Sequence, residues 1–275
     1  MKLQIYHLAA ISLILAAGAA IGVNSVDADH SWGSYHWARE SNPFALKLGD
    51  NMSDAWDPYL KRASEDWSIS SVLDTTIVAG GNLFNPKNCK PKAGRIEVCN
   101  ARYGNNGWLG LAQIWASGSH ITQATAKMND TYFNTVTYNT PAWRRLVVCQ
   151  EIAHDFGLDH QDEVFNNANL GTCMDYTNDP DGGAGGKVEN DPSNEYPNAH
   201  DYEELGIIYA HLDSFTTIGQ TIAKGKSSGA SAPADSEDPG EWGKEIRKSS
   251  DGRNSLFERD LGGGRKIFTF VIWAK

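Results

Sequence analysis

The sequence has no excess of positive charge, since 24 Lys and Arg residues stand against 34 Asp and Glu, for a net charge of −10. Nucleic-acid binding generally needs a basic face, so the composition gives that class of function no support. No internal repeat is visible, and beyond the N-terminal region no apolar run approaches the roughly 20 residues that span a bilayer. The 9 tryptophans argue against a disordered chain.

The N-terminal residues are typical of a secretory signal peptide, which we assign to residues 1–28. Lys2 supplies a short positive region, and an apolar run follows from Leu8 to Ala20. Small residues place the expected cleavage near Ala20 or Ala28. The alternative is an uncleaved membrane anchor, for which the run is short. We therefore expect a secreted, extracellular protein without stable membrane association after signal cleavage.

The chain has 4 cysteines, and an even count in an exported protein indicates two disulfides. Proximity in the sequence favours a Cys89–Cys99 bond, which leaves Cys149 to pair with Cys173. Four reduced, buried thiols are the alternative, and the export signal makes that alternative the weaker one.

Hydrophobic periodicity predicts a helix, a series of strands and two further helices along the main domain. Between the strands and the helices, Gly, Asn, Asp and Pro mark turns and one long loop at Asn178–Asn198. Helices are expected at Asp50–Trp67, with Asp50, Asn51 and Ser53 as cap candidates, at Pro141–Phe156 and at Asp201–Leu212; strands are expected at 70–79, 95–101, 109–116 and 120–128, with an extended segment within 30–50. The fold class is therefore α/β or α+β.

The C-terminal part differs in composition from the main domain, to which we assign residues 29–223. Residues 224–240 are rich in Gly, Ser, Ala, Pro and Asp and are typical of a flexible linker. In the remaining segment, 241–275, the run Lys266–Ala274 predicts a strong strand. A segment this small is not expected to fold alone, so we expect it to add a hairpin or an edge strand to the main domain.

The segment CQEIAHDFGLDHQD holds the residues with the clearest chemistry. On a helix, residues four apart share a face, so Gln150 and His154 point the same way, with Glu151 beside them. Gly157 can end the helix and turn the chain back. His160 can then approach the same point as His154. The pattern gathers metal-binding groups next to a carboxylate.

This segment resembles the motif of the metzincin zinc peptidases, H-E-x-x-H-x-x-G-x-x-H followed by a Met-turn. Glu151, His154, Gly157 and His160 fall on the pattern, and Met174 in GTCMDYT stands where a Met-turn would. The order of elements over residues 32–214 is similar to a matrixin-type catalytic domain. The resemblance implies a zincin domain with a mixed twisted sheet, an active-site helix, a Met-turn and a C-terminal helix. It also implies a monomeric, Zn²⁺-dependent endopeptidase that acts on proteins or peptides.

The sequence departs from the family at Gln150, where the family has its first zinc-binding histidine. An amide oxygen is a weaker zinc donor than an imidazole. Three possibilities remain open: Gln150 binds zinc through its oxygen, Asp162 takes its place, or the site is inactive and the fold serves as a binding module. The presence of Glu151 favours a working site.

The resemblance assigns roles to the other residues. Zinc would be held by Gln150, His154 and His160, and Glu151 would be the general base. Tyr176 stands two residues after Met174, the spacing of astacins and serralysins, and would help to stabilise the oxyanion. A buried core tyrosine is an equally good interpretation. Met174 would form an apolar floor beneath the metal without binding it.

Several other residues are weaker candidates. His120 lies in an expected strand and could line the cleft, although a solvated histidine is the simpler interpretation, as is a surface role for His200. Cys89, in NCKPK, does not match the cysteine switch of matrixins, so latency by a thiolate is not predicted. Ca²⁺ binding is a further expectation, but a solvated acidic loop is favoured over a calcium site at Asp179, Asp181, Glu189 and Asp191.

Overall fold

The computed structural model describes residues 30–183, 190–219 and 236–275. The expected signal peptide and most of the expected linker lie outside these residues, so the boundaries at 1–28, 29–223, 224–240 and 241–275 stay predictions. Among the described residues, no helix combines the length and the apolar character needed to span a bilayer.

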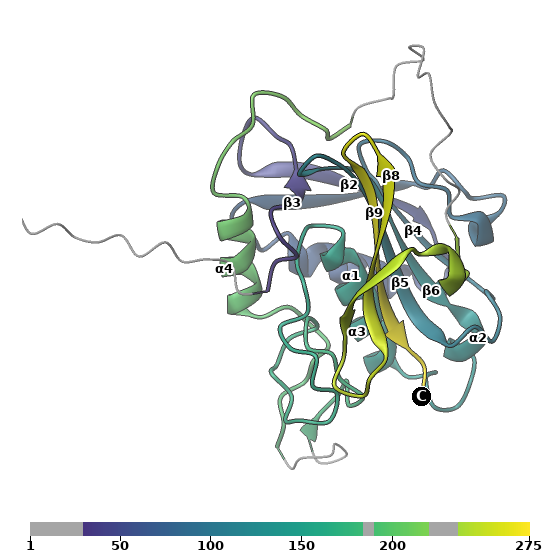
Figure 1. The fold of residues 1–275 in the computed structure, drawn as a ribbon. Coiled ribbons are helices and arrows are strands. Elements are labelled where there is room, and N and C mark those ends of the chain that lie inside the picture. Colours follow the sequence, from purple (N-terminus) through teal and green to yellow (C-terminus); the bar gives the residue numbers. More distant parts are fainter. Residues whose placement is uncertain (1–29, 184–189, 220–235) are drawn as a thin grey trace, which may run out of the picture.

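A single mixed sheet is the main structural element of the molecule (Figure 1). Its strands follow the order β3-β2-β4-β6-β5-β9-β8-β7, and the short β1 pairs with β6 off this path. Along this spatial order, neighbouring strands are parallel from β3 through β2 and β4 to β6. They are antiparallel from β6 through β5, β9 and β8 to β7. The strands are β1 (His36–Trp37), β2 (Phe44–Asn51), β3 (Leu73–Ala79), β4 (Ile96–Ala101), β5 (Trp108–Ser117), β6 (His120–Asn129), β7 (Lys244–Lys248), β8 (Asn254–Gly262) and β9 (Arg265–Trp273).

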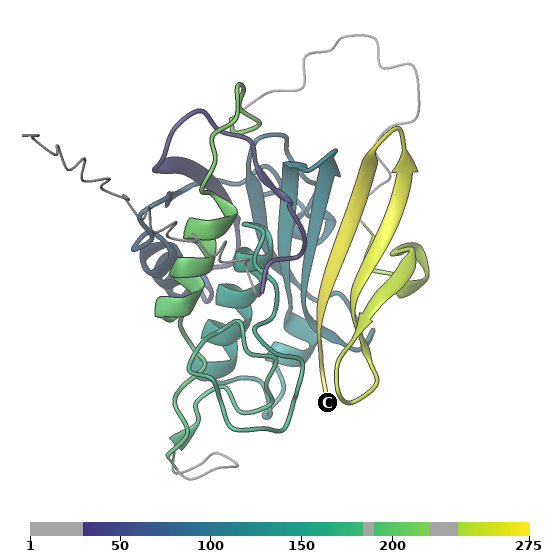
Figure 2. The same cartoon turned by 60° about the vertical axis from the view of Figure 1, so that its left-hand side comes forward.

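The main helices lie on one side of the sheet, while β7, β8 and β9 continue it at one end (Figure 2). They are α1 (Asp57–Trp67), α3 (Pro141–His154) and α4 (Ala199–Ile208); α2 (Asp130–Phe133) is a single turn. Helix α3 packs on α1, β5 and β6, and its apolar residues join one large core with the inner face of the sheet. Pro141 opens α3, and the Thr140 side chain accepts a hydrogen bond from the Trp143 N–H at 3.3 Å.

The expected mixed α+β class, with its mixed sheet and its three helices, is confirmed. The start of the first helix was wrong: Asp50 and Asn51 end β2 instead of capping a helix, and α1 begins at Asp57. The last helix covers Ala199–Ile208 and so begins and ends earlier than expected. An Asn198–Asp201 capping box explains its start. The C-terminal extension supplies three strands, where a hairpin or an edge strand was expected.

Two cysteine pairs lie at bonding distance. Cys89 and Cys99 connect the short helix η1 (Pro86–Asn88) to β4, with their Cα atoms 6.0 Å apart. Cys149 and Cys173 join α3 to the turn that contains Met174, with the same Cα separation of 6.0 Å. The second bond therefore fixes the helix that carries the motif to the segment beneath it.

Candidate metal centre

The end of α3 is shaped by a glycine that other residues could not replace. Gly157 has φ +105°, and a Cβ atom at this position would lie 2.6 Å from the Tyr35 backbone oxygen. The chain turns back here, and Leu158 forms a β-bridge with Ser31. This reversal brings His160 next to His154, as the motif predicts.

The carbonyls at the end of α3 are satisfied by side chains from the N-terminal segment. The Trp32 indole N–H donates to the His154 carbonyl oxygen at 3.2 Å, and the Trp37 indole N–H donates to the Asp155 carbonyl oxygen at 2.8 Å. Because the last carbonyls of a helix lack partners within it, these two bonds complete the helix end at the site.

His154 and His160 face each other through their Nε2 atoms, which lie 3.1 Å apart. The Nδ1 atom of His154 lies 2.9 Å from the Leu158 carbonyl oxygen, and that of His160 lies 2.8 Å from Glu163 Oε1. A carbonyl or a carboxylate can only accept, so each Nδ1 carries the proton and each Nε2 of a neutral ring presents a lone pair. Burial lowers the pKa of His154 well below its ordinary value, which favours that neutral ring.

Two facing lone pairs repel unless a cation or a proton lies between them. Zinc binds imidazole nitrogen at about 2.0–2.1 Å with tetrahedral angles, which places two such nitrogens roughly 3.3 Å apart. The observed separation of 3.1 Å is close to that value. The carboxylate of Glu163 behind His160 matches the usual support of a metal-bound histidine. The two histidines therefore fit a shared zinc ion.

Gln150 lies on the same helix and is 0% exposed. Its Nε2 donates to the Cys173 carbonyl oxygen at 2.8 Å and to the Asp175 carbonyl oxygen at 3.3 Å. Its Oε1 is buried without a hydrogen-bond partner among the described residues. An acceptor that remains unsatisfied in the core costs free energy, so a cation at Oε1 would remove a defect.

Asp162 is occupied elsewhere. Its Oδ1 accepts from the Val164 N–H at 2.8 Å, and its Oδ2 accepts from the Asn167 side chain at 2.5 Å. These bonds organise the loop after His160. The carboxylate of Asp162 therefore has a structural explanation that the amide oxygen of Gln150 lacks.

Glu151 is enclosed on α3, three residues before His154. It is 0% exposed, and neither carboxylate oxygen makes a hydrogen bond of normal geometry with a described residue. The carboxylate rests on the backbone of β5 at Gly110, where a Cβ atom would come within 2.3 Å of Glu151 Oε1. Burial raises the pKa of Glu151 well above its ordinary value, against the opposing effect of the nearby Ala112 N–H. A buried carboxylate with a raised pKa in such a place is typical of a functional site.

Tyr176 and Met174 lie on the side of the site formed by the turn. Met174 is fully buried, and its carbonyl oxygen accepts from the Gln161 N–H at 2.7 Å, just past His160. The Tyr176 ring lies 4.9 Å from the His160 ring, centroid to centroid. Burial raises the pKa of the Tyr176 hydroxyl, which therefore stays protonated. The placement of Tyr176 suits either a hydrogen-bond donor to a substrate or a core aromatic residue.

The other candidates lie away from this site. His120 belongs to a separate cluster with His36 and Asp213, and the His200 ring lies 4.8 Å from the ring of His30. The calcium expectation gains no support among the described residues, since Asp191 Oδ2 accepts from the Asn169 N–H at 3.0 Å. Glu189, also named for that site, lies outside the described residues.

The C-terminal hairpin, formed by β7, β8 and β9, covers the candidate centre, and no pattern in the sequence predicts this covering. The Phe270 ring of β9 stacks on the His154 ring with centroids 4.0 Å apart and planes 11° apart. Arg247 of β7 forms an ion pair with Asp159 and lies 3.7 Å from Glu163 Oε1. The Ser255 hydroxyl of β8 donates to the same Glu163 oxygen at 3.0 Å.

No family model matches this chain, and no curated protein matches its sequence. Among solved structures it is similar to high choriolytic enzyme 1, a hatching-enzyme zinc protease of the medaka fish Oryzias latipes, with a TM-score of 0.36 and 10% identity over 65% of this chain and 96% of that one. It is also similar to myroilysin, with a TM-score of 0.36 and 12% identity over 66% of this chain and 98% of that one.

Proposed function

We propose that this chain is a secreted zinc-dependent endopeptidase that hydrolyses peptide bonds in proteins or peptides. Gln150, His154 and His160 hold the zinc ion, and Glu151 is the general base. One observation carries the proposal: the Nε2 atoms of His154 and His160 face each other at 3.1 Å while both Nδ1 atoms are engaged elsewhere. The unpartnered oxygen of Gln150 and the buried carboxylate of Glu151 complete the donor set and the acid–base group.

A bound zinc ion supplies Lewis acidity, polarising the scissile carbonyl and bringing the pKa of a coordinated water toward neutrality. Glu151 accepts the proton of the attacking water and passes it to the leaving amine. Positive charge beside Glu151 lowers the pKa of its carboxyl group, which burial otherwise raises. Glu151 is therefore ionised when zinc is bound. The protonated hydroxyl of Tyr176 donates a hydrogen bond to the oxygen on which charge develops.

A catalytically weak or inactive binding protein is the alternative function. The observation in its favour is that the Gln150 amide is already held by two carbonyl groups, which fixes the position of its oxygen. An amide fixed for packing would leave only two histidines for the metal. The metal content of the protein and its peptidase activity separate the two functions.

The test compares the full chain with the Glu151→Gln variant and with a Glu203→Gln control, which changes an exposed carboxylate on α4. Casein or a quenched fluorescent peptide is the substrate. We expect cleavage that a chelator suppresses and zinc restores, with a loss of about 10²–10⁴-fold in kcat for Glu151→Gln only. His160→Ala should lose the zinc itself. Retained activity in Glu151→Gln, or zinc content unchanged in His160→Ala, would overturn the proposal.

A further inference from the structure

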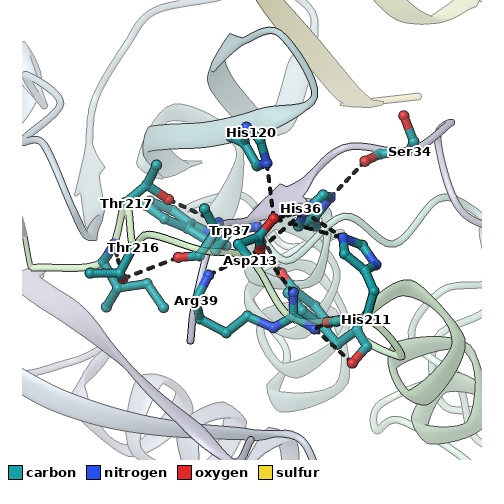
Figure 3. Close-up of polar contacts among 12 residues, drawn as sticks. Ser34, His36, Trp37, Arg39, His120, His211, Asp213, Thr216 and Thr217 are labelled. Carbon is teal, nitrogen blue, oxygen red and sulfur yellow. Dashed lines mark hydrogen bonds and ion pairs between the residues drawn. The ribbon is translucent and has the colours of Figure 1, made fainter. Parts of the chain in front are cut away.

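Outside the peptidase centre, three separate segments bring histidines to one carboxylate (Figure 3). His36 lies in β1, and its register partner His120 begins β6. His211 and Asp213 follow α4. Their side chains point toward one another in the close-up view, and none of these residues takes part in the centre described above.

The donor atoms lie at the separations that a small cation requires. His36 Nε2 lies 3.1 Å from His211 Nε2 and 3.4 Å from Asp213 Oδ2. His211 Nε2 lies 3.9 Å from Asp213 Oδ1. One donor atom from each of these three residues lies within 4.8 Å of the others. His36 Nδ1 is 2.8 Å from the Ser34 carbonyl oxygen, so Nδ1 is the protonated nitrogen and Nε2 has a free lone pair.

The carboxylate of Asp213 is oriented from two sides, as a metal-binding carboxylate usually is. Its Oδ2 accepts from the Arg39 backbone N–H at 3.1 Å and from Arg39 Nη1 at 3.2 Å. Its Oδ1 lies 3.1 Å from His120 Nε2. The side chains of His36 and Asp213 are only 4% and 9% exposed, whereas that of His211 is 56% exposed. A cation can therefore enter past His211.

We propose that His36, His211 and Asp213 bind a second divalent cation, with His120 as a positioning residue for the carboxylate. Two imidazoles and a carboxylate are a donor set that suits zinc. The ion would join the N-terminal segment and the start of β6 to the loop after α4. Its role would be structural, since the cluster contains no general base aimed at an open position.

Metal stoichiometry tests this proposal without any need for activity. The full chain, loaded with Zn²⁺ at micromolar concentration and dialysed against metal-free buffer, should retain two equivalents per chain. His211→Ala, which changes a mostly exposed side chain, should retain one, as should His160→Ala. His200→Ala is the matched control and should retain two.

Loaded with Co²⁺ instead, wild type minus His211→Ala should give a difference spectrum of a four- or five-coordinate site. Zinc content in His211→Ala equal to that of wild type would overturn the proposal, as would a wild-type protein whose single equivalent disappears in His160→Ala. In the second case the peptidase centre would survive while this site would not.

A second and independent observation concerns β9, which pairs with β5, the strand on which the Glu151 carboxylate rests. Without the C-terminal segment, β5 would be the edge of the sheet. Strand β9 pairs with it antiparallel along its length, from Trp108↔Trp273 to Ser117↔Arg265. Addition of an extended segment to a sheet edge is also a general way in which proteins bind peptides. The Glu151 carboxylate rests on this same strand at Gly110.

Contacts with the centre itself reinforce this arrangement. Opposite Ala112 in the register, Phe270 covers the His154 ring. Arg247 and Ser255 hold Glu163, the residue behind His160. With the hairpin in place, Glu151 and His154 are 0% exposed, so a substrate reaches them only when the hairpin moves aside, and the full chain keeps a low activity.

We infer that the hairpin β7–β9 is an intramolecular inhibitor that occupies the place of an extended peptide substrate. This inference rests on the proposed peptidase function. It explains how a chain without a cysteine-switch motif can be latent: the block lies at the C-terminal end and is made of backbone pairing, one aromatic ring and one arginine.

Two measurements on the zinc-loaded full chain test the inference: kcat/KM on a quenched fluorescent peptide, and the rate at which a coloured chelator removes zinc from the peptidase centre. All variants carry His211→Ala in addition, so that one zinc ion is followed. Phe270→Ala and Arg247→Ala should each raise both rates at least tenfold. Val271→Ala and Arg259→Ala are the matched controls, because Val271 packs in the second core on the other face of the hairpin and Arg259 pairs with Glu241.

The controls should change both rates less than threefold. Rates for Phe270→Ala and Arg247→Ala that equal those of the controls would overturn the inference. Faster zinc removal without peptide cleavage in any variant would support the covering role of the hairpin and refute the peptidase function. The two proposals can therefore fail separately.

Discussion

Gly110→Ala gives the sharpest test of the packing at the centre. The methyl group would lie 2.3 Å from Glu151 Oε1 and 2.6 Å from Val147 Cγ1. Separations this short are incompatible with normal van der Waals contact, so α3 or the Glu151 side chain must move. Both neighbours are 0% exposed, which leaves little space for that movement.

The magnitude follows from two opposing effects. Overpacking a closed core costs about 1–3 kcal/mol. Replacing glycine by alanine inside a strand returns about 0.5–1 kcal/mol through reduced conformational freedom of the unfolded chain. The net loss in the free energy of unfolding is up to about 2.5 kcal/mol, which corresponds to a decrease in Tm of up to about 10 °C for a domain of this size.

Gly206→Ala is the matched control, because this glycine lies in α4 and an added Cβ would meet nothing within 4 Å. It should raise the free energy of unfolding by about 0.4–1 kcal/mol. Thermal melts of both variants, together with peptidase assays, check the prediction. If Gly110→Ala melted at or above the wild-type temperature with full activity, the Glu151 carboxylate would not rest on β5 as described.

Three further outcomes are expected. Burial raises the pKa of Asp175 to about 6, so stability associated with its protonated form is complete below the unfolded value near 3.8 and is lost as pH rises through about 6. Asp175→Asn, which mimics that form, should stabilise by up to about 3 kcal/mol at pH 7 and flatten the profile of Tm against pH between 4 and 6, and an unchanged profile would contradict this. Cys149→Ser combined with Cys173→Ser should cost about 3 kcal/mol in urea unfolding, because the bond closes a separation of 24 residues, and an equal midpoint would refute that estimate. Gln150→His should tighten zinc binding in competition titrations, and unchanged affinity would place Gln150 outside the donor set.

The sequence predicts well those features that depend on local spacing. The i, i+4 spacing on α3 and the glycine at 157 place His154 and His160 together, because helix geometry and a left-handed turn act over a few residues. The strands of residues 96–129 were found for the same reason, since their β-branched and apolar residues lie between clear turns.

Features that depend on distant pairing escaped prediction. Strands β7 and β8 contain few apolar residues, and their pairing is set by β9 and by contacts near His160. The cluster of His36, His211 and Asp213 joins residues up to 177 positions apart, so no spacing in the sequence could reveal it. The position of Phe270 over the centre also depends on strand register, which cannot be predicted from a single sequence.

The two tryptophan indoles at the end of α3 have a consequence for solution behaviour. Indole N–H groups neither gain nor lose protons at accessible pH, and their bonds to carbonyl oxygens involve no net charge. The end of α3, which lies between His154 and His160 in the chain, is therefore held by hydrogen bonds that do not depend on pH or ionic strength. The turn that directs the two rings toward each other therefore keeps these two hydrogen bonds when the pH or the salt concentration changes.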